Sequence, residues 1–298
     1  MMQSPLFILS PPRSFTSITC AMLGCHPQMF GLAETKLFAR DKLGELREFY
    51  RAQPSMEHGL LRSLSEMMFG EQTVETIETV RSWLAENDDM SAPGLFRAMQ
   101  ERLGERRLID KSPLHVYELE SLRRMSRTFP DARYLHLTRH PGEMVKSAFQ
   151  LREKIRSQQR LRRQLPKQRP SVTAPDTMWL EPHVNILEFL ETVPAHQQMR
   201  LRGEDLLGDP QNYLRQIAEW LGIGAAPSDI EAMMHPENSA FATYGPRNAR
   251  FGIDPNFMER PHLRPFTYTP RPLVWETPTG ETIELSEPVR ACAMIFGY

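Results

Sequence analysis

Short apolar runs and amphipathic helical patterns alternate along most of this chain. Leu6–Leu9 is a continuous apolar run that ends at Ser10 and two prolines, which is typical of a buried strand with both faces covered. Further short strands are predicted at Arg106–Asp110, Arg133–Thr138 and Met199–Leu201. Because strands that alternate with helices form parallel sheets with right-handed crossovers, the pattern predicts an α/β fold.

Helical periodicity dominates the long stretch between the first two predicted strands. There we expect a large helical insertion after the first strand, at about residues 35–104, that would form a cap or wall over a site. Residues from about 240 to 298 are rich in proline and aromatics, and we expect them to wrap the core as loops within a single domain, 1–298. The predicted helices are Ser14–Gly24, Thr35–Arg51, His58–Phe69, Val74–Glu86, Pro93–Leu103, Leu114–Thr128, Gly142–Ile155, Asn212–Leu221 and Pro288–Phe296.

Composition places the chain among ordinary globular proteins. Its 298 residues are 40% hydrophobic and 24% charged, and a net charge of −1 gives no electrostatic attraction to nucleic acid or a membrane surface. No apolar run approaches the roughly 18–20 residues that cross a bilayer, and the first run is too short for a secretory signal. Three cysteines without a CxxC pair indicate a reducing compartment and no zinc site. We therefore expect a cytoplasmic protein that needs no metal.

The first strand leads through Ser10–Ser17 (SPPRSFTS) into the first predicted helix. Unpaired N–H groups at a helix N-terminus favour an anion, and Arg13 adds a planar cation suited to phosphate or sulfate. A serine-rich N-capping turn is the simpler alternative. The loop has no GxxxxGK[ST] pattern, so no lysine is placed there to hold the β- and γ-phosphates of ATP.

Two segments of this chain resemble the nucleotide-binding motifs of sulfotransferases. PPRSFTS is similar to their 5′-phosphosulfate loop, and YLHLTRHPGEMVKSAF (Tyr134–Phe149) is similar to their 3′-phosphate motif. The resemblance implies that Arg13 and its loop neighbours hold the 5′-phosphosulfate, and that Arg139 and Ser147 clamp the 3′-phosphate. An ordinary strand–helix connection would also fit the spacing of Arg139 and Ser147. The implied loop residues are Arg13, Ser14, Phe15, Thr16 and Ser17.

The similarity extends over nearly the whole chain. It includes DKSP at Asp110–Pro113 and RGEDLLGDPQNYLRQIAEWLGI, whose first residue, Arg202, ends a strand in the family pattern. GPRNARFGIDPNF is similar to the late loop that closes over the adenosine diphosphate, which implies contacts from Arg247 and Asn248. The chain most resembles bacterial sulfotransferases, including those of polyketide pathways, and the tyrosylprotein group. In one departure, Phe15 stands where the family loop usually has glycine.

Membership in this family would imply a P-loop-NTPase-like fold and a transfer reaction. A sulfuryl group would move from 3′-phosphoadenosine 5′-phosphosulfate, a cosubstrate, to an acceptor hydroxyl by in-line displacement. We expect Arg13 to stabilise the leaving oxygen and Lys111 to lie close to the transferring group. The alternative for Lys111 is a structural ion pair with Asp110.

The resemblance offers two candidates for the base that deprotonates the acceptor. Glu34 follows the first helix at the spacing of the catalytic glutamate in tyrosylprotein-type enzymes, although a helix N-terminal charge would also explain it. His183, in MWLEPHVNILEFL, lies in a pattern similar to a helix of polyketide-associated enzymes where a histidine is the base. A solvated or capping histidine is the alternative there. Of the two, the spacing favours Glu34.

Several possibilities stay open at the level of the sequence. A P-loop-like nucleotide kinase would need the missing loop lysine, and a non-catalytic nucleotide-binding protein has only Phe15 in its favour. Arg152–Arg169 carries eight basic residues and one acidic residue. A solvated helix face with a linker explains this segment best, and a docking strip for an acidic partner is the alternative. The acceptor itself, a small molecule or a carrier-bound chain bearing a hydroxyl, is not specified.

Overall fold

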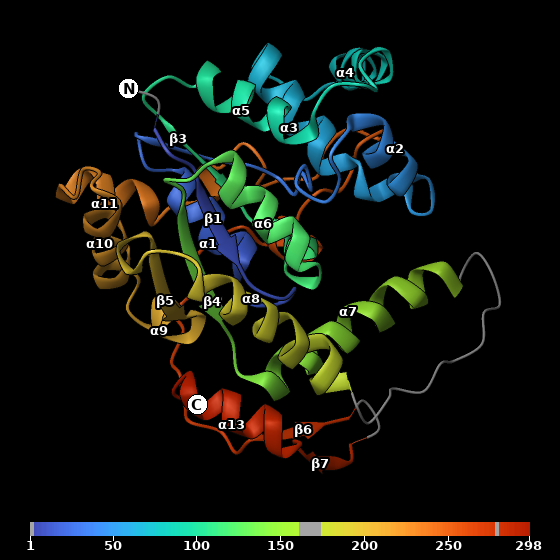
Figure 1. Ribbon diagram of the computed structural model, residues 1–298. Helices are drawn as coiled ribbons and strands as arrows, with labels where there is room; N and C mark the ends of the chain where they lie inside the picture. The colour runs from blue at the N-terminus through green and yellow to red at the C-terminus, as the bar shows by residue number, and fades with distance from the viewer. Residues whose placement is uncertain (1–2, 161–173, 278–279) are drawn as a thin grey trace.

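Five parallel strands form the centre of the molecule. The structure, a computed structural model, describes residues 3–160, 174–277 and 280–298. The strand order is β2-β3-β1-β4-β5, and every pairing in this sheet is parallel (Figure 1). The strands are β1 (Leu6–Leu9), β2 (Met29–Gly31), β3 (Arg107–Asp110), β4 (Arg133–Thr138) and β5 (Gln198–Arg202). The predicted α/β class is therefore confirmed.

The central strand β1 is buried on both faces, as its continuous apolar run predicts. Phe7 and Leu9 join a core cluster with the helices of the insertion, whereas Leu6 and Ile8 join the cluster on the opposite face. Side chains alternate between the two faces of a strand, so a strand covered on both sides needs apolar residues at every position. Leu6 is also paired with both Ile109 of β3 and Arg133 of β4, which places β1 between them.

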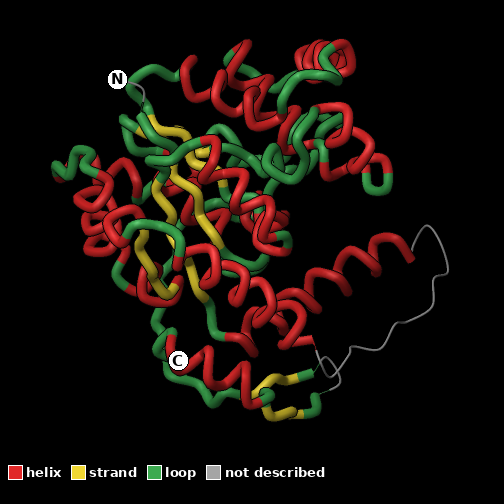
Figure 2. Tube along the Cα trace, in the orientation of Figure 1, coloured by secondary structure: helices red, strands yellow, loops and turns green. Residues whose placement is uncertain are grey.

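Helices cover both faces of the sheet, and loops join them (Figure 2). Figure 1 shows α3, α4 and α5 at the top of the view and α13 with the β6–β7 hairpin at the bottom. The helices are α1 (Thr16–Gly24), α2 (Leu43–Arg51), α3 (His58–Phe69), α4 (Val74–Glu86), α5 (Ala92–Arg102), α6 (Leu119–Thr128), α7 (Pro141–Arg160), α8 (Glu181–Glu191), α9 (Gly203–Gly208), α10 (Pro210–Leu221), α11 (Pro227–Met233), α12 (Pro255–Glu259) and α13 (Glu287–Ile295). The short hairpin strands are β6 (Val274–Glu276) and β7 (Thr282–Glu284).

The helical insertion forms as α2 to α5, but two details of the prediction change. A short strand, β2, precedes the insertion, and its three residues are too few to give a periodic signal. The predicted helix Thr35–Arg51 is wrong over its first part, because α2 begins at Leu43. Lys36 has a left-handed φ of 56°, and its N–H donates to Ser112 Oγ at 3.0 Å instead of to a helical carbonyl. The loop before α2 is thus tied to the end of β3.

The C-terminal residues combine loops with more regular structure than the sequence predicts. The expected terminal helix is present as α13, but the β6–β7 hairpin was not predicted. Trp275 of the hairpin and Val289 of α13 share a core cluster with Trp179. This segment therefore packs as an integral part of the core beside α7 and α8.

Helix α7 carries the start of the basic segment. The side chains described there are Arg152, whose guanidinium lies over the Phe149 ring, and Lys154, which pairs with Glu259. The rest of the predicted docking strip, to Arg169, lies outside the side chains that the structure describes. In the described part of the chain, we find no helix with the length and apolar character needed to cross a membrane.

Candidate active site

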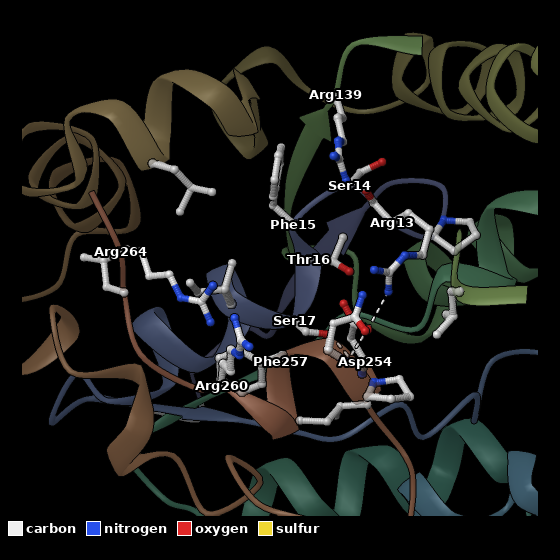
Figure 3. A pocket seen from close by; sticks show the side chains of 18 of the residues that line it. Arg13, Ser14, Phe15, Thr16, Ser17, Arg139, Asp254, Phe257, Arg260 and Arg264 are labelled. Atoms are coloured by element: carbon white, nitrogen blue, oxygen red, sulfur yellow. Dashed lines mark hydrogen bonds and ion pairs between the residues drawn. The ribbon is translucent and has the colours of Figure 1, made fainter. Parts of the chain in front are cut away.

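Four loops meet at the carboxyl edge of the sheet, where parallel α/β folds bind ligands. The phosphate loop follows β1, Glu34 follows β2, Lys111 follows β3 and Arg139 follows β4. Together with residues 253–266, these loops line a cavity of about 550 Å³ (Figure 3). That volume is within the usual range for a small-molecule site.

The phosphate loop has an unusual backbone for its sequence. Arg13 and Phe15 both have left-handed conformations, with φ of 68° and 63°, and Phe15 is the N-cap of α1. Left-handed residues next to a helix start turn successive N–H groups toward one concavity, which suits an anion. The buried hydroxyl of Ser14, which lines the cavity, has no hydrogen-bond partner among the described residues. This backbone geometry and the unpartnered hydroxyl are compatible with the predicted anion site.

The Phe15 ring packs between Arg139, Phe266 and Gly203. The guanidinium carbon of Arg139 lies 4.4 Å from the ring centroid, and Phe266 packs edge-on at 6.1 Å. A Cβ at Gly203 would lie 2.4 Å from the ring, so glycine is required there. Phe15 therefore stands where the family usually has glycine, and its ring packs against Gly203 and the guanidinium of Arg139.

Arg139 and Ser147 both contact Arg13, so the two predicted phosphate sites are linked. Arg139 Nη1 donates to the Arg13 carbonyl at 2.5 Å, and Arg13 Nε donates to Ser147 Oγ at 3.2 Å. Arg139 is in turn oriented by Trp179, whose indole N–H donates to the Arg139 carbonyl at 2.7 Å. Arg139 Nε is buried and has no partner among the described residues, which leaves this N–H for a ligand.

Arg13 also forms an ion pair that the sequence does not reveal. Its Nη1 lies 2.5 Å from Asp254 Oδ1, and the Asp254 N–H donates to Ser17 Oγ at 3.3 Å. Asp254 is also the N-cap of α12, since its side chain accepts from the Asn256 N–H at 3.0 Å. The late loop is therefore attached to the phosphate loop through Asp254.

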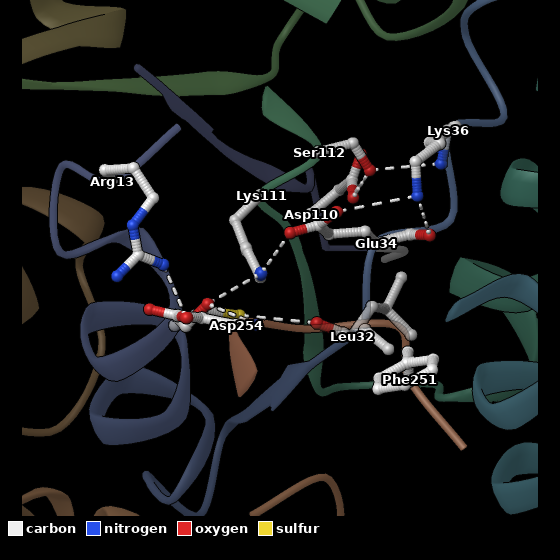
Figure 4. A network of polar contacts seen from close by, with 12 residues as sticks. Arg13, Leu32, Glu34, Lys36, Asp110, Lys111, Ser112, Phe251 and Asp254 are labelled. Atoms are coloured by element: carbon white, nitrogen blue, oxygen red, sulfur yellow. Dashed lines mark hydrogen bonds and ion pairs between the residues drawn. The ribbon is translucent and has the colours of Figure 1, made fainter. Parts of the chain in front are cut away.

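Lys111 and Glu34 form a polar centre at the Ser17 end of the phosphate loop (Figure 4). Lys111 Nζ donates to Glu34 Oε1 at 2.7 Å and to Ser17 Oγ at 2.9 Å, while Lys36 Nζ lies 3.5 Å from Glu34 Oε2. Burial acts to raise the pKa of Glu34, but the two ammonium groups outweigh it and hold that pKa below its usual value. Glu34 is therefore ionised at neutral pH, and it lines the cavity.

Lys111 does not form the structural ion pair with Asp110 that was the alternative for it. Its hydrogen bonds go to Glu34 and Ser17, whereas Asp110 accepts from Ser112 Oγ at 2.8 Å. Burial raises the pKa of Asp110 to about 6. The side chain of Lys111 is thus directed to the phosphate loop, as the expected role requires.

Three predicted nucleotide contacts are not brought to the cavity. Arg202 donates from Nε and Nη2 to the two oxygens of Asp205, both at 2.7 Å, and lies against the Tyr298 ring. Asn248 donates to the Val74 carbonyl and so attaches the late loop to α4, and Arg247 is exposed. The family resemblance implied these contacts, but the side chains of Arg202 and Asn248 have other partners, and Arg247 does not line the cavity.

His183 is also away from the cavity, in a buried chain of ring nitrogens. Arg200 Nε lies 3.3 Å from His136 Nδ1, and His136 Nε2 lies 2.9 Å from His183 Nδ1. Because arginine only donates, His136 accepts at Nδ1 and donates from Nε2 to His183. Burial, with the nearby Arg200, lowers the pKa of His183 to about 3. His183 is fully buried, which excludes the solvated alternative, and it does not line the cavity; its role as the base stays a prediction.

Three residues that line the cavity are not among those predicted from the sequence. Arg260, Arg264 and Phe266 line it, from the segment that follows the late-loop motif. The signal was present in ERPHLRPF, where arginines alternate with proline and aromatic residues, but it lies just beyond the part that resembles the family. Among the described residues, no group of three histidine, cysteine or carboxylate side chains is placed to hold a metal ion.

Comparisons with known proteins identify the family of this chain. The model of the sulfotransferase family matches residues 5–227. The chain belongs to the sulfotransferase family. That match includes the phosphate loop, Glu34, Lys111, Arg139 and Ser147, whereas Asp254 and the arginines after it lie beyond the matched residues.

Individual relatives are distant and cover different shares of the chain. The ω-hydroxy-β-dihydromenaquinone-9 sulfotransferase Stf3 of Mycobacterium bovis is 29% identical over 136 residues, which make up 44% of this chain and 33% of that protein. The aligned part is thus about a third of the curated relative. The same protein of Mycobacterium tuberculosis matches equally.

Two solved structures share the fold over almost the whole chain. The sulfotransferase domain of the curacin biosynthetic pathway superposes with a TM-score of 0.77 at 23% identity, covering 99% of this chain and 98% of that one. The sulfotransferase domain of the Synechococcus PCC 7002 olefin synthase gives a TM-score of 0.74 at 23% identity, with 99% and 96% covered. The parallel sheet with its flanking helices is therefore the sulfotransferase fold.

Proposed function

We propose that this protein transfers a sulfuryl group from 3′-phosphoadenosine 5′-phosphosulfate to an acceptor hydroxyl. One observation carries the proposal: a single cavity is lined by the phosphate loop, by Arg139 and by Glu34, which Lys111 connects to the loop. Anion-binding groups and an ionised carboxylate therefore border the same space.

The cavity residues have distinct roles in this proposal. Ser14, Thr16, Ser17 and the N-terminal N–H groups of α1 hold the 5′-phosphosulfate, and Arg139 holds the 3′-phosphate with Ser147 in support. Orphaned polar atoms of Ser14 and Arg139 fit a ligand rich in anionic oxygens. The residues that close the nucleotide site are Arg260, Arg264 and Phe266, in place of Arg247 and Asn248.

The reaction is an in-line displacement at sulfur. The acceptor oxygen forms a bond to sulfur while the bond to the bridging phosphate oxygen breaks, and 3′-phosphoadenosine 5′-phosphate leaves with that electron pair. Glu34 takes the acceptor proton, and Lys111 and Arg13 stabilise the charge that develops on the leaving oxygen. The acceptor is a small molecule or a carrier-bound chain with a hydroxyl, a class supported by the ω-hydroxy substrate in the name of the mycobacterial relative.

Nucleotide binding gives a direct test of this function against the kinase alternative. We expect 3′-phosphoadenosine 5′-phosphate at a hundred times its dissociation constant to stabilise the folded protein by about 2.7 kcal/mol in a thermal-shift titration. ATP with magnesium should have much less effect, because the loop has no lysine of the P-loop type. Stabilisation by ATP and magnesium alone would reject the proposal. Transfer of label from the donor to hydroxyl acceptors then separates an enzyme from a non-catalytic binder.

A further inference from the structure

The negatively charged carboxylate of Asp254 lies beside the proposed anion site. It lines the cavity, pairs with Arg13 and is close to Ser17, so it shares the end of the cavity where Lys111 and Glu34 meet the phosphate loop. A negative charge there repels the negative charge of any bound donor. Its presence therefore lowers the affinity for anions in general and most of all for those with the highest charge at this end.

Asp254 is held in place by several contacts that do not depend on Arg13. Its side chain caps α12, and the chain before it is anchored where the Glu34 N–H donates to the Gly252 carbonyl at 2.8 Å. Arg62, which is 1% exposed, donates to the Phe251 carbonyl at 3.1 Å. These anchors hold the loop at the cavity independently of Arg13.

Charges at this end of the cavity are nearly balanced. The cations Arg13 and Lys111 lie opposite the carboxylates of Asp254 and Glu34, with Lys36 behind Glu34. A terminal sulfate carries one negative charge, whereas a terminal phosphate carries close to two at neutral pH. A site with little excess positive charge is suited to the first and penalises the second.

We propose that Asp254 is a specificity residue that selects a 5′-phosphosulfate over a 5′-diphosphate. The inference rests on the proposed function, which places the terminal group of the donor at this end of the cavity. Asp254 acts by charge repulsion, and its N-cap contact and ion pair hold the carboxylate at the cavity. Partial exposure of the side chain, at 24%, screens the effect to about tenfold in relative affinity.

Asp254→Asn tests the proposal, because asparagine caps a helix as well as aspartate does but carries no charge. Calorimetric titrations in magnesium-free buffer without acceptor compare 3′-phosphoadenosine 5′-phosphosulfate with 3′-phosphoadenosine 5′-diphosphate. We expect the preference of the parent protein for the phosphosulfate to shrink about tenfold in Asp254→Asn. Asp254→Ser, another capping residue, provides a second neutral variant if the first is unstable.

Glu259→Gln is the matched control, since it removes a carboxylate from the same helix at the end that pairs with Lys154. This variant should keep the parent preference. An unchanged preference in both neutral Asp254 variants, with both nucleotides still bound, would overturn the inference and leave the proposed function intact. If the parent protein bound neither nucleotide, the proposed function would fail, and this inference with it.

Discussion

The guanidinium of Arg139 lies over the ring of Phe15, with its central carbon 4.4 Å from the ring centroid. One residue belongs to the loop after β1 and the other to the loop after β4, so the stacking joins the two predicted phosphate-binding motifs. A planar cation over an aromatic face gains roughly 0.5–2 kcal/mol, depending on its exposure. The phenylalanine that replaces the usual glycine thus has a role in orienting the arginine.

Phe15→Gly and Phe15→Ala separate the backbone of this position from its side chain. Both variants lose the ring, but alanine in a left-handed conformation is strained by about 1 kcal/mol, whereas glycine is not. We expect the free energy of unfolding, measured by denaturant titration, to be about 1 kcal/mol higher for Phe15→Gly than for Phe15→Ala. Equal stabilities would mean that the loop relaxes to another conformation once the ring is removed.

Arg139→Ala should weaken binding of 3′-phosphoadenosine 5′-phosphate by about 1.5–3 kcal/mol, the range for a charge-assisted hydrogen bond. Adenosine 5′-phosphosulfate has no 3′-phosphate, so its affinity should change far less. Arg247→Ala is the control, because Arg247 is exposed and does not line the cavity. Titration calorimetry with both nucleotides measures the effect. Equal losses for the two nucleotides in Arg139→Ala would exclude the 3′-phosphate role.

The sequence predicts every strand of the sheet except β2, and most helices, because their signals are local. Leu6–Leu9 needs apolar residues on both faces, and α10 ends at Leu221, just before Gly222, whose φ of 67° suits glycine. Helices α3 and α4 have the predicted bounds. Where long-range contacts decide the structure, as at Lys36 and its bond to Ser112, the periodic pattern predicts a helix that does not form.

For the site, motif position predicts the backbone better than the side chain. The phosphate loop, Glu34, Lys111 and Arg139 follow strand ends, so the sheet itself brings them together. Arg202 also lies at a strand end, as the last residue of β5, but its guanidinium pairs with Asp205, three residues later. Asp254 pairs with Arg13 because a long loop brings it to the phosphate loop, and no local sequence pattern predicts that contact. Residues placed by such loops are therefore the ones that sequence analysis misses.

Acid should destabilise this protein through its buried histidines. The pKa values of His115 and His183 are both lowered to about 3, from about 6.5 in the unfolded chain. Their contribution to stability is present above about pH 6.5 and is lost as the pH falls toward 3, by up to about 1.4 kcal/mol per pH unit for each group. Asp110, with a pKa raised to about 6, opposes this trend between pH 6 and 4.

The His183→Gln variant isolates one of these contributions. Glutamine can accept the hydrogen bond from His136 Nε2 and does not titrate. We expect the free energy of unfolding, measured by urea titration at several pH values from 7 to 4.5, to depend less on pH in this variant than in the parent. Parallel curves for the two proteins would show that His183 is not buried in its neutral form.

Glu34→Gln tests the proposed base while keeping its shape. Glutamine can still accept from Lys111 Nζ, so nucleotide affinity should stay within a few-fold of the parent, whereas the transfer rate should fall roughly 100- to 10,000-fold. Since the pKa of Glu34 lies below its usual value, the group stays ionised as the pH falls, and the parent rate should show no step near pH 6.5. His183→Gln should retain most of the rate, because the buried ring does not line the cavity. Single-turnover measurements with labelled donor and an alcohol acceptor give these rates directly. Full activity in Glu34→Gln, or a rate in the parent that rises through pH 6.5 and is lost in His183→Gln, would assign the proton transfer to the histidine instead.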